Sequence, residues 1–326
     1  MTTALERAIR SQPEALQRIV ELDIGDAVKR VATWQRLWLI GTGTSQHAAE
    51  IGARMFREAG VDSHAVPAMQ FVLEEPLLRS GDAAIIITHT AETAFALAAR
   101  ARASSEGLSL LSITRKDSGL PESIGTVLKE ESETYTVSYT TTLLLLARLA
   151  GSLGAGTGSD ELVTHVPHAV RVAMDKPGTD EIPIPERLLV VAGCGVASVT
   201  AREGALKVRE AARFPAEGYD AEYLLHGSAV PLGKSDRLLI LSPPGNGAGF
   251  LDSLGTAAEG AGVPVTRVHE GADLPPLLAQ IPLTVRLQLL ALRFATIRGQ
   301  DPDTVITGAW DDERLWTIGS PPEEDA

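Results

Sequence analysis

Four polar residues in the second half of the chain could together transfer protons: Glu203, Lys207, Glu210 and His226. We interpret the stretch 203–227 as a helix. Residues three or four positions apart share one face of an α-helix, so Glu203, Lys207 and Glu210 would form an acid, a base and a second acid in one stripe. A carboxylate held beside a substrate can remove a proton from it. Two ordinary explanations compete, because such stripes are common on solvated helices and His226 could be a buried structural histidine.

Strand-like apolar runs alternate with helical patterns, which predicts parallel sheets covered by helices on both faces. The runs of the first half are Leu37–Ile40, Ala83–Thr88 and Leu108–Thr114, with helices expected at about 46–59 and up to about 105. In the second half, Leu188–Ala192 and Asp236–Leu241 repeat this order at a nearly constant offset. A constant offset indicates two copies of one domain, with sites at the carboxyl ends of the strands.

We therefore expect an α/β protein with two tandem, doubly wound parallel-sheet domains. The stretches GSLGAGTGSD and KPGTDEIPIPE are candidate linkers, because they are rich in glycine, serine or proline. The expected first domain, residues 1–160, carries N-terminal helices and the binding loops. The second, residues 161–326, carries the helix with Glu203 and a C-terminal tail.

Hydroxyl side chains gather in two turns of the first copy. The turns are GTGTS after the first strand and THTAET after the second, and their hydroxyl residues include Thr44, Ser45, Thr88, Thr90 and Thr93. Each turn precedes a predicted helix, where backbone amides and the helix dipole favour an anion such as phosphate. Helix capping is the alternative, since Ser and Thr are common N-caps. The matching turn of the second copy, SPPGNG, has a single serine, so we expect one phosphate site per chain.

Composition limits the partners. The net charge of −13 argues against nucleic acid or an anionic membrane, because both are polyanions. The chain has one cysteine, Cys194, which excludes an internal disulfide, and its 7 histidines show no metal-ligand spacing. The N-terminus does not have the pattern of a signal peptide, and no apolar run approaches a membrane span in length. We expect a cytoplasmic protein without metal or cofactor.

These segments resemble the tandem sugar isomerase (SIS) domains that form the isomerase half of glucosamine-6-phosphate synthase. The resemblance rests on Gly43-Thr44-Ser45, on Thr88–Thr93 in place of S-Q-S-G-E-T, and on E-G-A-L-K-x-x-E at Glu203–Glu210, with His226 at the family's distance. It extends over roughly residues 20–315 and includes the D-x-D that follows the last helix.

The resemblance implies an aldose–ketose phosphosugar isomerase that works through an enediol or enamine. Glu210 would be the catalytic base, and Glu203 and Lys207 would position it and tune its charge. His226 would help to open the sugar ring in a neighbouring subunit's site, which implies a homodimer. The sugar phosphate would be held by the two hydroxyl turns, with His89 in place of the usual glutamine: Gly43, Thr44, Ser45, Thr88, His89, Thr90 and Thr93.

Three departures from the family narrow the expected reaction. The chain begins with MTTALER and has no cysteine near its start, so we expect no glutamine-dependent chemistry. The family's tail lysine falls at Trp310, which disfavours an imine with the protein and favours a substrate that brings its own nitrogen. The stretch KEESETYTVSYTTT, residues 129–142, resembles the family's substrate loop, but the usual lysine is Val137. One register of this stretch would bring Glu133 and Tyr135 toward the sugar. Deamination or deglycation therefore stands beside plain isomerisation.

Two other classes remain as alternatives. A non-catalytic phosphosugar sensor would keep the hydroxyl turns and lose the base, and the intact Glu203 to His226 set argues against it. A nucleotide-dependent oxidoreductase is suggested by GTGTS and GCGVAS after strands, with Asp62 at roughly the distance of a ribose-binding acid. Neither turn completes G-x-G-x-x-G, which disfavours that class.

Overall fold

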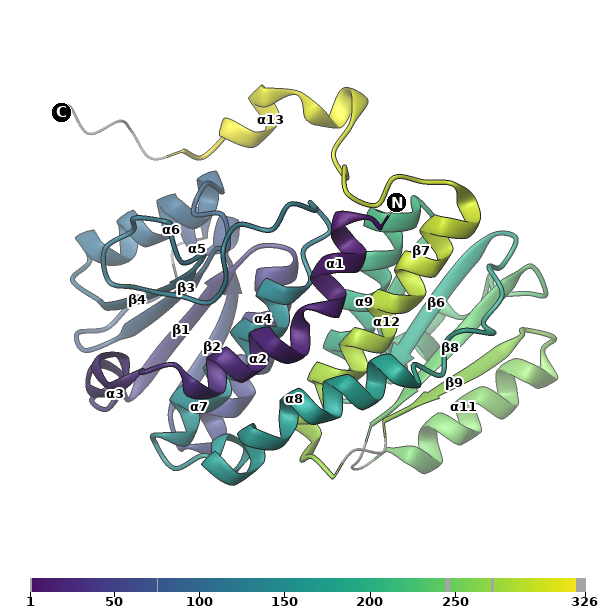
Figure 1. Ribbon diagram of the computed structural model, residues 1–326, viewed down its shortest axis with the longest axis horizontal. Helices are drawn as coiled ribbons and strands as arrows, with labels where there is room; N and C mark the ends of the chain where they lie inside the picture. Colours follow the sequence, from purple (N-terminus) through teal and green to yellow (C-terminus); the bar gives the residue numbers. More distant parts are fainter. Residues whose placement is uncertain (1, 75, 244–246, 271–272, 321–326) are drawn as a thin grey trace. The chain divides into compact units, whose positions relative to one another are not determined.

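The computed structural model of the chain describes residues 2–74, 76–243, 247–270 and 273–320. Two parallel sheets organise it (Figure 1). The first has the order β2-β1-β3-β4-β5, with β1 at Arg36–Gly41, β2 at Asp62–Pro67, β3 at Ala83–Ile87, β4 at Ser109–Thr114 and β5 at Ser123–Gly125. The second has the order β7-β6-β8-β9, with β6 at Leu188–Gly193, β7 at Ala216–Asp220, β8 at Asp236–Ser242 and β9 at Val265–His269. The predicted α/β class with two parallel sheets is confirmed.

The chain forms two compact units that do not follow the sequence in a single cut. The β1 unit contains Ala15–Glu130, Val137–Thr164 and the segment from Ile306 onward. The β6 unit contains the residues up to Glu14, Glu131–Thr136 and His165–Val305. The expected boundary near residue 160 lies close to the crossing at 164–165, but the first residues of the chain group with the second sheet and the tail groups with the first.

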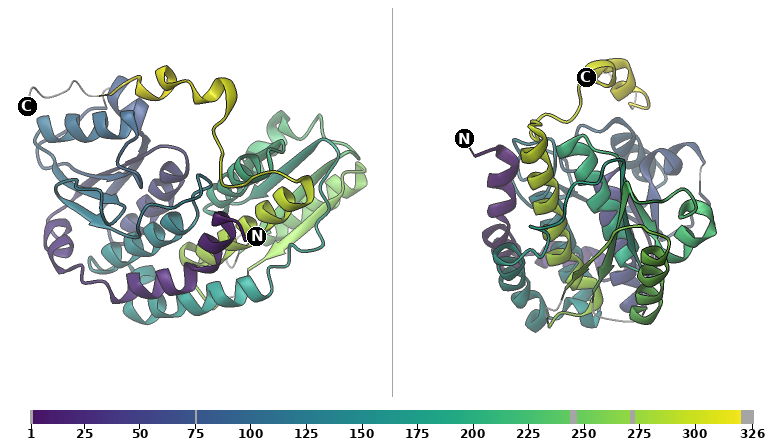
Figure 2. Two further views of the ribbon diagram at one scale, coloured as in Figure 1. Left: turned by 45° about the horizontal axis from the view of Figure 1, so that its top comes forward. Right: turned by 90° about the vertical axis from the view of Figure 1, so that its right-hand side faces the viewer.

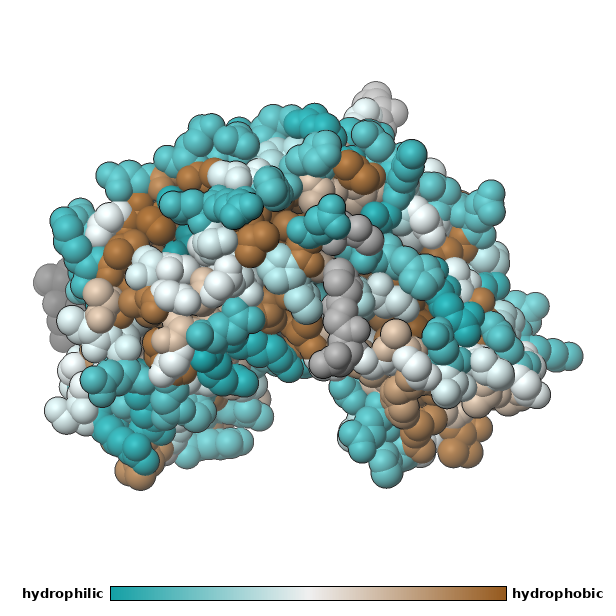
Figure 3. Space-filling model, turned by 90° about the horizontal axis from the view of Figure 1, so that it is seen from below, coloured by the Kyte–Doolittle hydropathy of each residue, from teal (hydrophilic) through white to brown (hydrophobic). Residues whose placement is uncertain are grey.

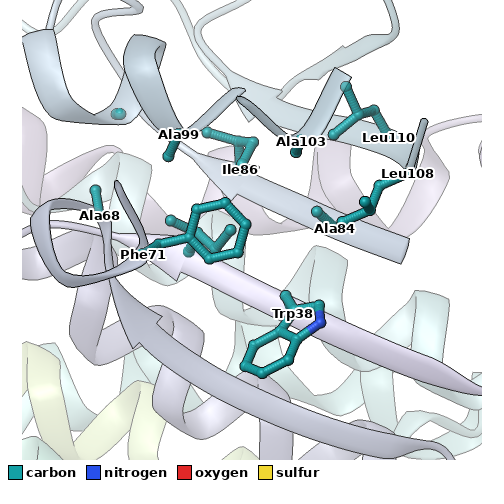
Figure 4. Close-up of a cluster of buried hydrophobic side chains, with 11 residues drawn as sticks. Trp38, Ala68, Phe71, Ala84, Ile86, Ala99, Ala103, Leu108 and Leu110 are labelled. Atoms are coloured by element: carbon teal, nitrogen blue, oxygen red, sulfur yellow. The ribbon is translucent and has the colours of Figure 1, made fainter. Parts of the chain in front are cut away.

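Helices cover both faces of the sheet in the β1 unit (Figure 1 and Figure 2). On one face α4 (Thr44–Glu58) packs against α7 (Val137–Gly151), and on the other α5 (Ala68–Leu73) packs against α6 (Ala94–Ser105). Under α5 and α6, Trp38 and Phe71 stand against small alanines of α6 and the apolar side chains of β1 and β3 (Figure 4). Strand β3, AAIII, is buried at every position, as expected for a central parallel strand.

The β6 unit repeats this arrangement around α9 (Ala197–Ala212), which packs on β6 and β7 and is covered by α12 (Pro276–Arg298). In turn, α1 (Ala4–Arg10) packs on α12. On the other face, α10 (Ala221–Tyr223) and α11 (Ala248–Gly260) cover an apolar cluster of β6 and β8. The remaining helices are α2 (Gln12–Glu21), α3 (Gly25–Val31), η1 (Gly156–Gly158), α8 (Asp160–Asp175), η2 (Leu224–Ser228), η3 (Gly308–Asp311) and α13 (Glu313–Thr317).

The two sheets share positions as well as strand order. Strands β1 and β6 begin at residues 36 and 188, which gives an offset of 152. At the same offset, Gly52 of α4 and Gly204 of α9 each mark a close approach to the covering helix. A Cβ on Gly52 would lie 2.8 Å from Leu146 of α7, and one on Gly204 would lie 2.4 Å from Leu287 of α12. A side chain at either glycine would therefore force the facing leucine to move.

In each sheet a buried aspartate lies at the amino end of the third strand in chain order, which is β3 in the first sheet and β8 in the second. Asp82 is 3% exposed and accepts hydrogen bonds from Arg36 and from the indole of Trp38, both at the start of the neighbouring strand. Asp236 is 2% exposed and accepts from Arg187 and, at 2.8 Å, from the amide of Gly233. Because a buried charge must be paired, these contacts fix how the amino ends of the central strands meet.

The strands that the sequence pattern missed are β2, β5, β7 and β9, and each is an edge strand of its sheet. Edge strands are buried less completely, so DSHAVP of β2 and AEGYD of β7 do not form continuous apolar runs. The helix expected over 203–227 was wrong beyond Ala212. There α9 ends with Arg213 as its C-cap, at a left-handed φ of 47° and two residues before Pro215, which cannot continue a helix. The stretch to Gly227 is therefore helix, strand and turn.

The expectation that no run reaches the length of a membrane span was wrong for α12. This helix has 23 residues, and an 18-residue window of it has a mean hydropathy of 1.3. Within the protein 83% of that window is buried, as in the core helix of a globular domain. On the face drawn in Figure 3, hydrophobic residues are scattered among hydrophilic ones.

Replacing the buried aspartate of the β6 unit should destabilise the protein in a pH-dependent way. Burial opposes ionisation of Asp236, but hydrogen bonds from Arg187 and Gly233 outweigh it, so the pKa of Asp236 is lowered. A folded pKa below the unfolded value stabilises the fold above about pH 4, and this contribution is lost as the pH falls through the folded pKa. Asp236→Asn should cost about 2 kcal/mol at pH 7 and much less near pH 3, as urea unfolding would measure. Asp26→Asn, at an exposed carboxylate, is the control; an equal loss at both pH values would contradict the assignment.

Candidate functional site

Helix α9 carries the acid-base-acid stripe in the interior of the β6 unit. One side of the helix packs on β6 and β7, and Gly204 lets α12 approach its other side. Glu203 is 0% exposed and Lys207 is 1% exposed, whereas the side chain of Glu210 is 19% exposed. The solvated-helix explanation is therefore excluded for the first two residues. Only the last carboxylate of the stripe reaches the surface.

The ammonium of Lys207 lies between the two carboxylates. Its Nζ is 2.6 Å from Oε2 of Glu210 and 3.5 Å from Oε1 of Glu203. Burial raises the pKa of Glu210, Lys207 lowers it, and the charge of Glu203 raises it again, so the resulting pKa is above that of an ordinary glutamate. A carboxylate with a raised pKa is a stronger base, which suits proton removal from a weakly acidic carbon. The stripe thus forms one partly exposed base backed by a buried ion pair.

His226 lies in a different part of the β6 unit from Glu210. The neighbour of Glu210 in the chain, Arg209, donates to the carbonyl of Ala216, so the last turn of α9 lies at the amino end of β7. His226 follows the carboxyl end of that strand, in the irregular turn η2, and is exposed. Gly227 has a φ of 116°, which other residues adopt only with strain. Within one chain, the strand therefore separates His226 from Glu210, and the buried-histidine explanation is excluded.

The first hydroxyl turn lies at the carboxyl end of β1 in the β1 unit. Gly43 is the N-cap of α4, and Thr44 and Ser45 are its first two residues, all at least partly accessible. The N-cap itself is a glycine, which has no side chain to cap the helix. In the β6 unit, the residues 152 positions later are Val196 and Ala197. At these two positions the β6 unit thus has apolar side chains in place of hydroxyls. Ser198, the next residue, donates its hydroxyl to the carbonyl of Gly195.

The second hydroxyl turn lies at the carboxyl end of β3. Thr88 is 3% exposed, and among the described residues its hydroxyl has no hydrogen-bond partner. Thr90 accepts from the amide of Glu92, and Thr93 is the N-cap of α6 without a side-chain capping bond. Ala91 has a φ of 58°, in the left-handed region that favours glycine. A strained turn around a buried, unsatisfied hydroxyl is typical of a ligand-binding loop.

His89 is held as a neutral ring within this turn. Its Nε2 accepts the amide of Glu130 at 3.2 Å, so the ring proton is on Nδ1. Burial lowers the pKa of His89; Arg115 and Lys129 lower it further, and Glu130 and Asp117 raise it. A neutral His89 can donate through Nδ1–H, as the amide of a glutamine would.

Two residues that sequence reasoning missed support the second hydroxyl turn. Arg115 donates its backbone amide to His89 and its Nε to the carbonyl of Thr90, and its guanidinium also pairs with Glu92. Glu130 accepts the amides of Val137 and Ser138 at the start of α7. The sequence signal that could have identified Arg115 is its position directly after the predicted strand Leu108–Thr114.

Glu133 and Tyr135 belong to the segment Glu131–Thr136, which is part of the β6 unit. Glu133 is exposed, and its carboxylate accepts the amide of Val305 at 2.6 Å. Tyr135 is half-buried and donates its amide to the carbonyl of Glu133. The carboxylate of Glu133 thus already fastens the chain that leaves α12.

The oxidoreductase alternative loses its supporting residue. Asp62 is the first residue of β2 and pairs with His64 at 2.9 Å and with Arg36 at 3.6 Å. A ribose-binding acid lies near the carboxyl ends of the strands, whereas Asp62 lies at the amino end of its strand.

Among the described residues, no group of three His, Cys, Asp or Glu side chains could hold a metal ion.

Residues 31–150 match the SIS domain family. The chain is 28% identical over 335 residues to glutamine–fructose-6-phosphate aminotransferase (isomerizing) of Thermococcus kodakarensis, and the alignment covers 91% of this chain and 56% of that protein. The corresponding enzyme of Caulobacter vibrioides is 24% identical over 346 residues, with 92% of this chain and 57% of the enzyme covered. The chain thus spans little more than half the length of these relatives.

Solved structures share the fold. Tagatose-6-phosphate ketose/aldose isomerase from Escherichia coli aligns with a TM-score of 0.80 at 19% identity over 95% of this chain and 98% of that one. Glucosamine-6-phosphate deaminase from Thermotoga maritima aligns with a TM-score of 0.78 at 22% identity over 92% and 97%. The chain therefore contains a SIS domain at 31–150 and is homologous to the isomerase half of the aminotransferases.

Removing the buried ammonium should destabilise the fold strongly. Lys207→Met leaves Glu203 and Glu210 in the interior without their cation, which typically costs about 3–5 kcal/mol. A carboxyl group whose folded pKa is raised destabilises the fold at neutral pH, and this penalty disappears as the pH falls and the group is protonated. The loss measured by urea unfolding should therefore be largest at pH 7 and shrink toward pH 4.

Lys29→Met is the matched control for this variant. Lys29 forms an exposed pair with Asp26 at 3.0 Å, also three positions apart. We expect no change in its unfolding midpoint. A Lys207→Met protein as stable as the parent at pH 7 would contradict the buried ion-pair account.

Proposed function

We propose that the protein is a phosphosugar isomerase, or a deaminase or deglycase, that acts on a hexose 6-phosphate or an amino-sugar 6-phosphate. The observation that carries this proposal is Glu210, a partly exposed carboxylate with a raised pKa, held at 2.6 Å by a buried lysine. The SIS domain and the phosphosugar enzymes with the same fold support the substrate class.

Glu210 would act as the base in this reaction. It would take the proton from C2 of the open-chain aldose and deliver it to C1, through an enediol or, with a 2-amino sugar, an enamine. With the amino sugar the product is a C2 imine, and water would release ammonia from it and leave the ketose phosphate. Lys207 would hold Glu210 in place and favour its ionised form, and Glu203 would in turn hold Lys207.

The two hydroxyl turns would hold the phosphate. Hydroxyl groups of Thr44, Ser45, Thr88, Thr90 and Thr93 donate without adding positive charge, which permits release of a phosphorylated product. The ends of α4 and α6 supply backbone amides and the helix dipole. Nδ1–H of His89 would donate in place of the usual glutamine amide.

A homodimer would explain the position of His226. The residue is exposed, and β7 separates it from Glu210 of its own chain. We propose that it assists ring opening in the site of a second copy. The position of the family's tail lysine is occupied here by Trp310, which is exposed and cannot form an imine. This supports a route in which the substrate, not the protein, supplies the nitrogen. The single cysteine is compatible with a reducing, cytoplasmic location.

Replacing Glu210 should abolish turnover and spare binding. Glu210→Gln keeps the size of the side chain but cannot accept a proton, so turnover should fall by about 10²–10⁴-fold. The assay measures ammonia release and aldose–ketose conversion on hexose 6-phosphates, amino-sugar 6-phosphates and fructosamine 6-phosphates. In the parent, kcat/KM should decline in acid through a pKa above that of an ordinary glutamate, about 4.3, because the base must be ionised.

Glu259→Gln, at an exposed glutamate of α11, is the control for this assay. Binding of sugar phosphates without turnover by either the parent or Glu210→Gln would favour the non-catalytic sensor.

The buried hydroxyl of Thr88 should matter for binding and not for folding. Thr88→Val removes a hydroxyl without a partner among the described residues, so the unfolding midpoint should stay the same or rise. Affinity for sorbitol 6-phosphate, measured by calorimetry, should fall by about 10–100-fold, since a hydrogen bond to a charged group is lost. Thr141→Val is the control, because that hydroxyl already donates to Val137 at 2.7 Å. A less stable Thr88→Val protein with unchanged affinity would indicate a purely structural hydroxyl.

A further inference from the structure

The D-x-D sequence after α12 binds two other segments of the β6 unit. Its residues are Asp301, Pro302 and Asp303, and the contacts that they make are here called the Asp303 clasp. The first set of contacts joins Asp303 to the start of α1. Oδ2 of Asp303 accepts the amide of Ala4 at 2.8 Å, and Oδ1 accepts the amide of Leu5 at 2.7 Å. The carboxylate thus satisfies two of the amides that a helix leaves unpaired at its first turn.

The second set of contacts holds the segment Glu131–Thr136. The hydroxyls of Ser132 and Thr134 both donate to the carbonyl of Pro302, at 3.2 and 2.7 Å. The amide of Glu133 donates to the carbonyl of Asp303 at 2.9 Å. Ser132 and Thr134 are each 1% exposed, so these bonds satisfy hydroxyls that water cannot reach.

Further contacts close the arrangement. The carboxylate of Glu133 accepts the amide of Val305, and Arg7 of α1 pairs with Glu131. The amide of Asp303 donates to its neighbour Asp301 at 3.0 Å, which fixes the turn. Three consecutive residues, 132–134, are therefore each hydrogen-bonded to the chain that follows α12.

The clasp holds the segment 131–136, which carries two candidate substrate-binding residues, Glu133 and Tyr135. Glu130 and Val137 flank the segment 131–136 and belong to the β1 unit, yet the segment itself belongs to the β6 unit. The clasp thus joins the segment that carries Glu133 and Tyr135 to residues 302–305 of the same unit.

We propose that Asp303 is a positioning residue for the loop 131–136. Its carboxylate anchors the backbone of residues 302–305, which holds the loop, to the amides at the start of α1. The proposal rests on the proposed function, because the loop matters only if it borders a sugar phosphate. Asp303 itself touches no substrate in this account. Loss of its carboxylate should release α1 and loosen the loop, and so weaken sugar phosphate binding while the base on α9 stays in place.

The test compares three variants of the full-length chain. Asp303→Ala removes the clasp carboxylate. Ser132→Ala combined with Thr134→Val leaves Asp303 and α1 intact and removes only the hydroxyls that hold the loop, so it addresses the loop even if Asp303→Ala fails to fold. Thr3→Ala is the control, because Thr3 caps α1 through the amide of Glu6 at 3.1 Å and does not bond to the loop.

Two measurements apply to each variant: amide hydrogen exchange of peptides covering 131–136 and α9, and calorimetric affinity for sorbitol 6-phosphate, which cannot isomerise. For Asp303→Ala and the double variant, each of which removes two hydrogen bonds, we expect exchange in the loop and the dissociation constant each to rise about tenfold, with α9 unchanged. Thr3→Ala should change neither. Asp303→Asn, which keeps one acceptor oxygen, should lie between the parent and Asp303→Ala.

Unchanged loop exchange, or faster exchange with unchanged affinity, would overturn the positioning role. An effect of Thr3→Ala equal to that of Asp303→Ala would overturn it too, because α1 alone would then explain the result. A parent protein that binds no sugar phosphate would overturn the proposed function and with it this proposal. The outcomes named before it overturn only the role of Asp303 and leave the proposed function standing.

Discussion

The β6 unit depends on one electrostatic constraint, the neutralisation of a lysine buried in its interior. An ammonium group as inaccessible as that of Lys207 is tolerated only beside opposite charge, and Glu203 and Glu210 supply it from the same helix. The constraint explains why α9 must keep the helical spacing of these three residues. It also leaves Glu210 as the carboxylate of the stripe with some access to solvent and a raised pKa. The residues that stabilise α9 thus include the proposed base.

The two units share packing features around their sheets but differ in the residues exposed at the ends of the strands. Strand order, the helix glycines at 52 and 204, and the buried aspartates at 82 and 236 recur because they solve the same packing problem in each unit. The exposed positions around them diverge. The turn after β1 has Thr44 and Ser45, whereas the turn after β6 has Val196 and Ala197 at the same positions. The remainder of the matching turn after β8, residues 244–246, lies outside the described residues.

Sequence patterns predicted the central strands and the helices that follow them, because buried parallel strands are continuous apolar runs. The edge strands were missed, since AEGYD of β7 carries a half-buried, polar pattern. The burial of Lys207 could not be predicted either, because spacing alone describes a solvated stripe equally well. Long-range contacts were beyond any local pattern: Arg115 supports the turn at His89, and Asp303 binds the amides of Ala4 and Leu5 from nearly 300 residues away. The separation of His226 from Glu210 likewise depends on β7, which the expected helix concealed.

The central claim is that Glu210 removes a proton from a carbon of a bound sugar phosphate. Its most direct test is NMR of hexose 6-phosphates and 2-amino-hexose 6-phosphates incubated with the protein in D₂O. The account predicts deuterium at C1 or C2 of the sugar that is turned over, with the parent protein and not with Glu210→Gln. Sugar phosphates that bind and yet keep their protons on both carbons, or that exchange equally fast with Glu210→Gln, would contradict it.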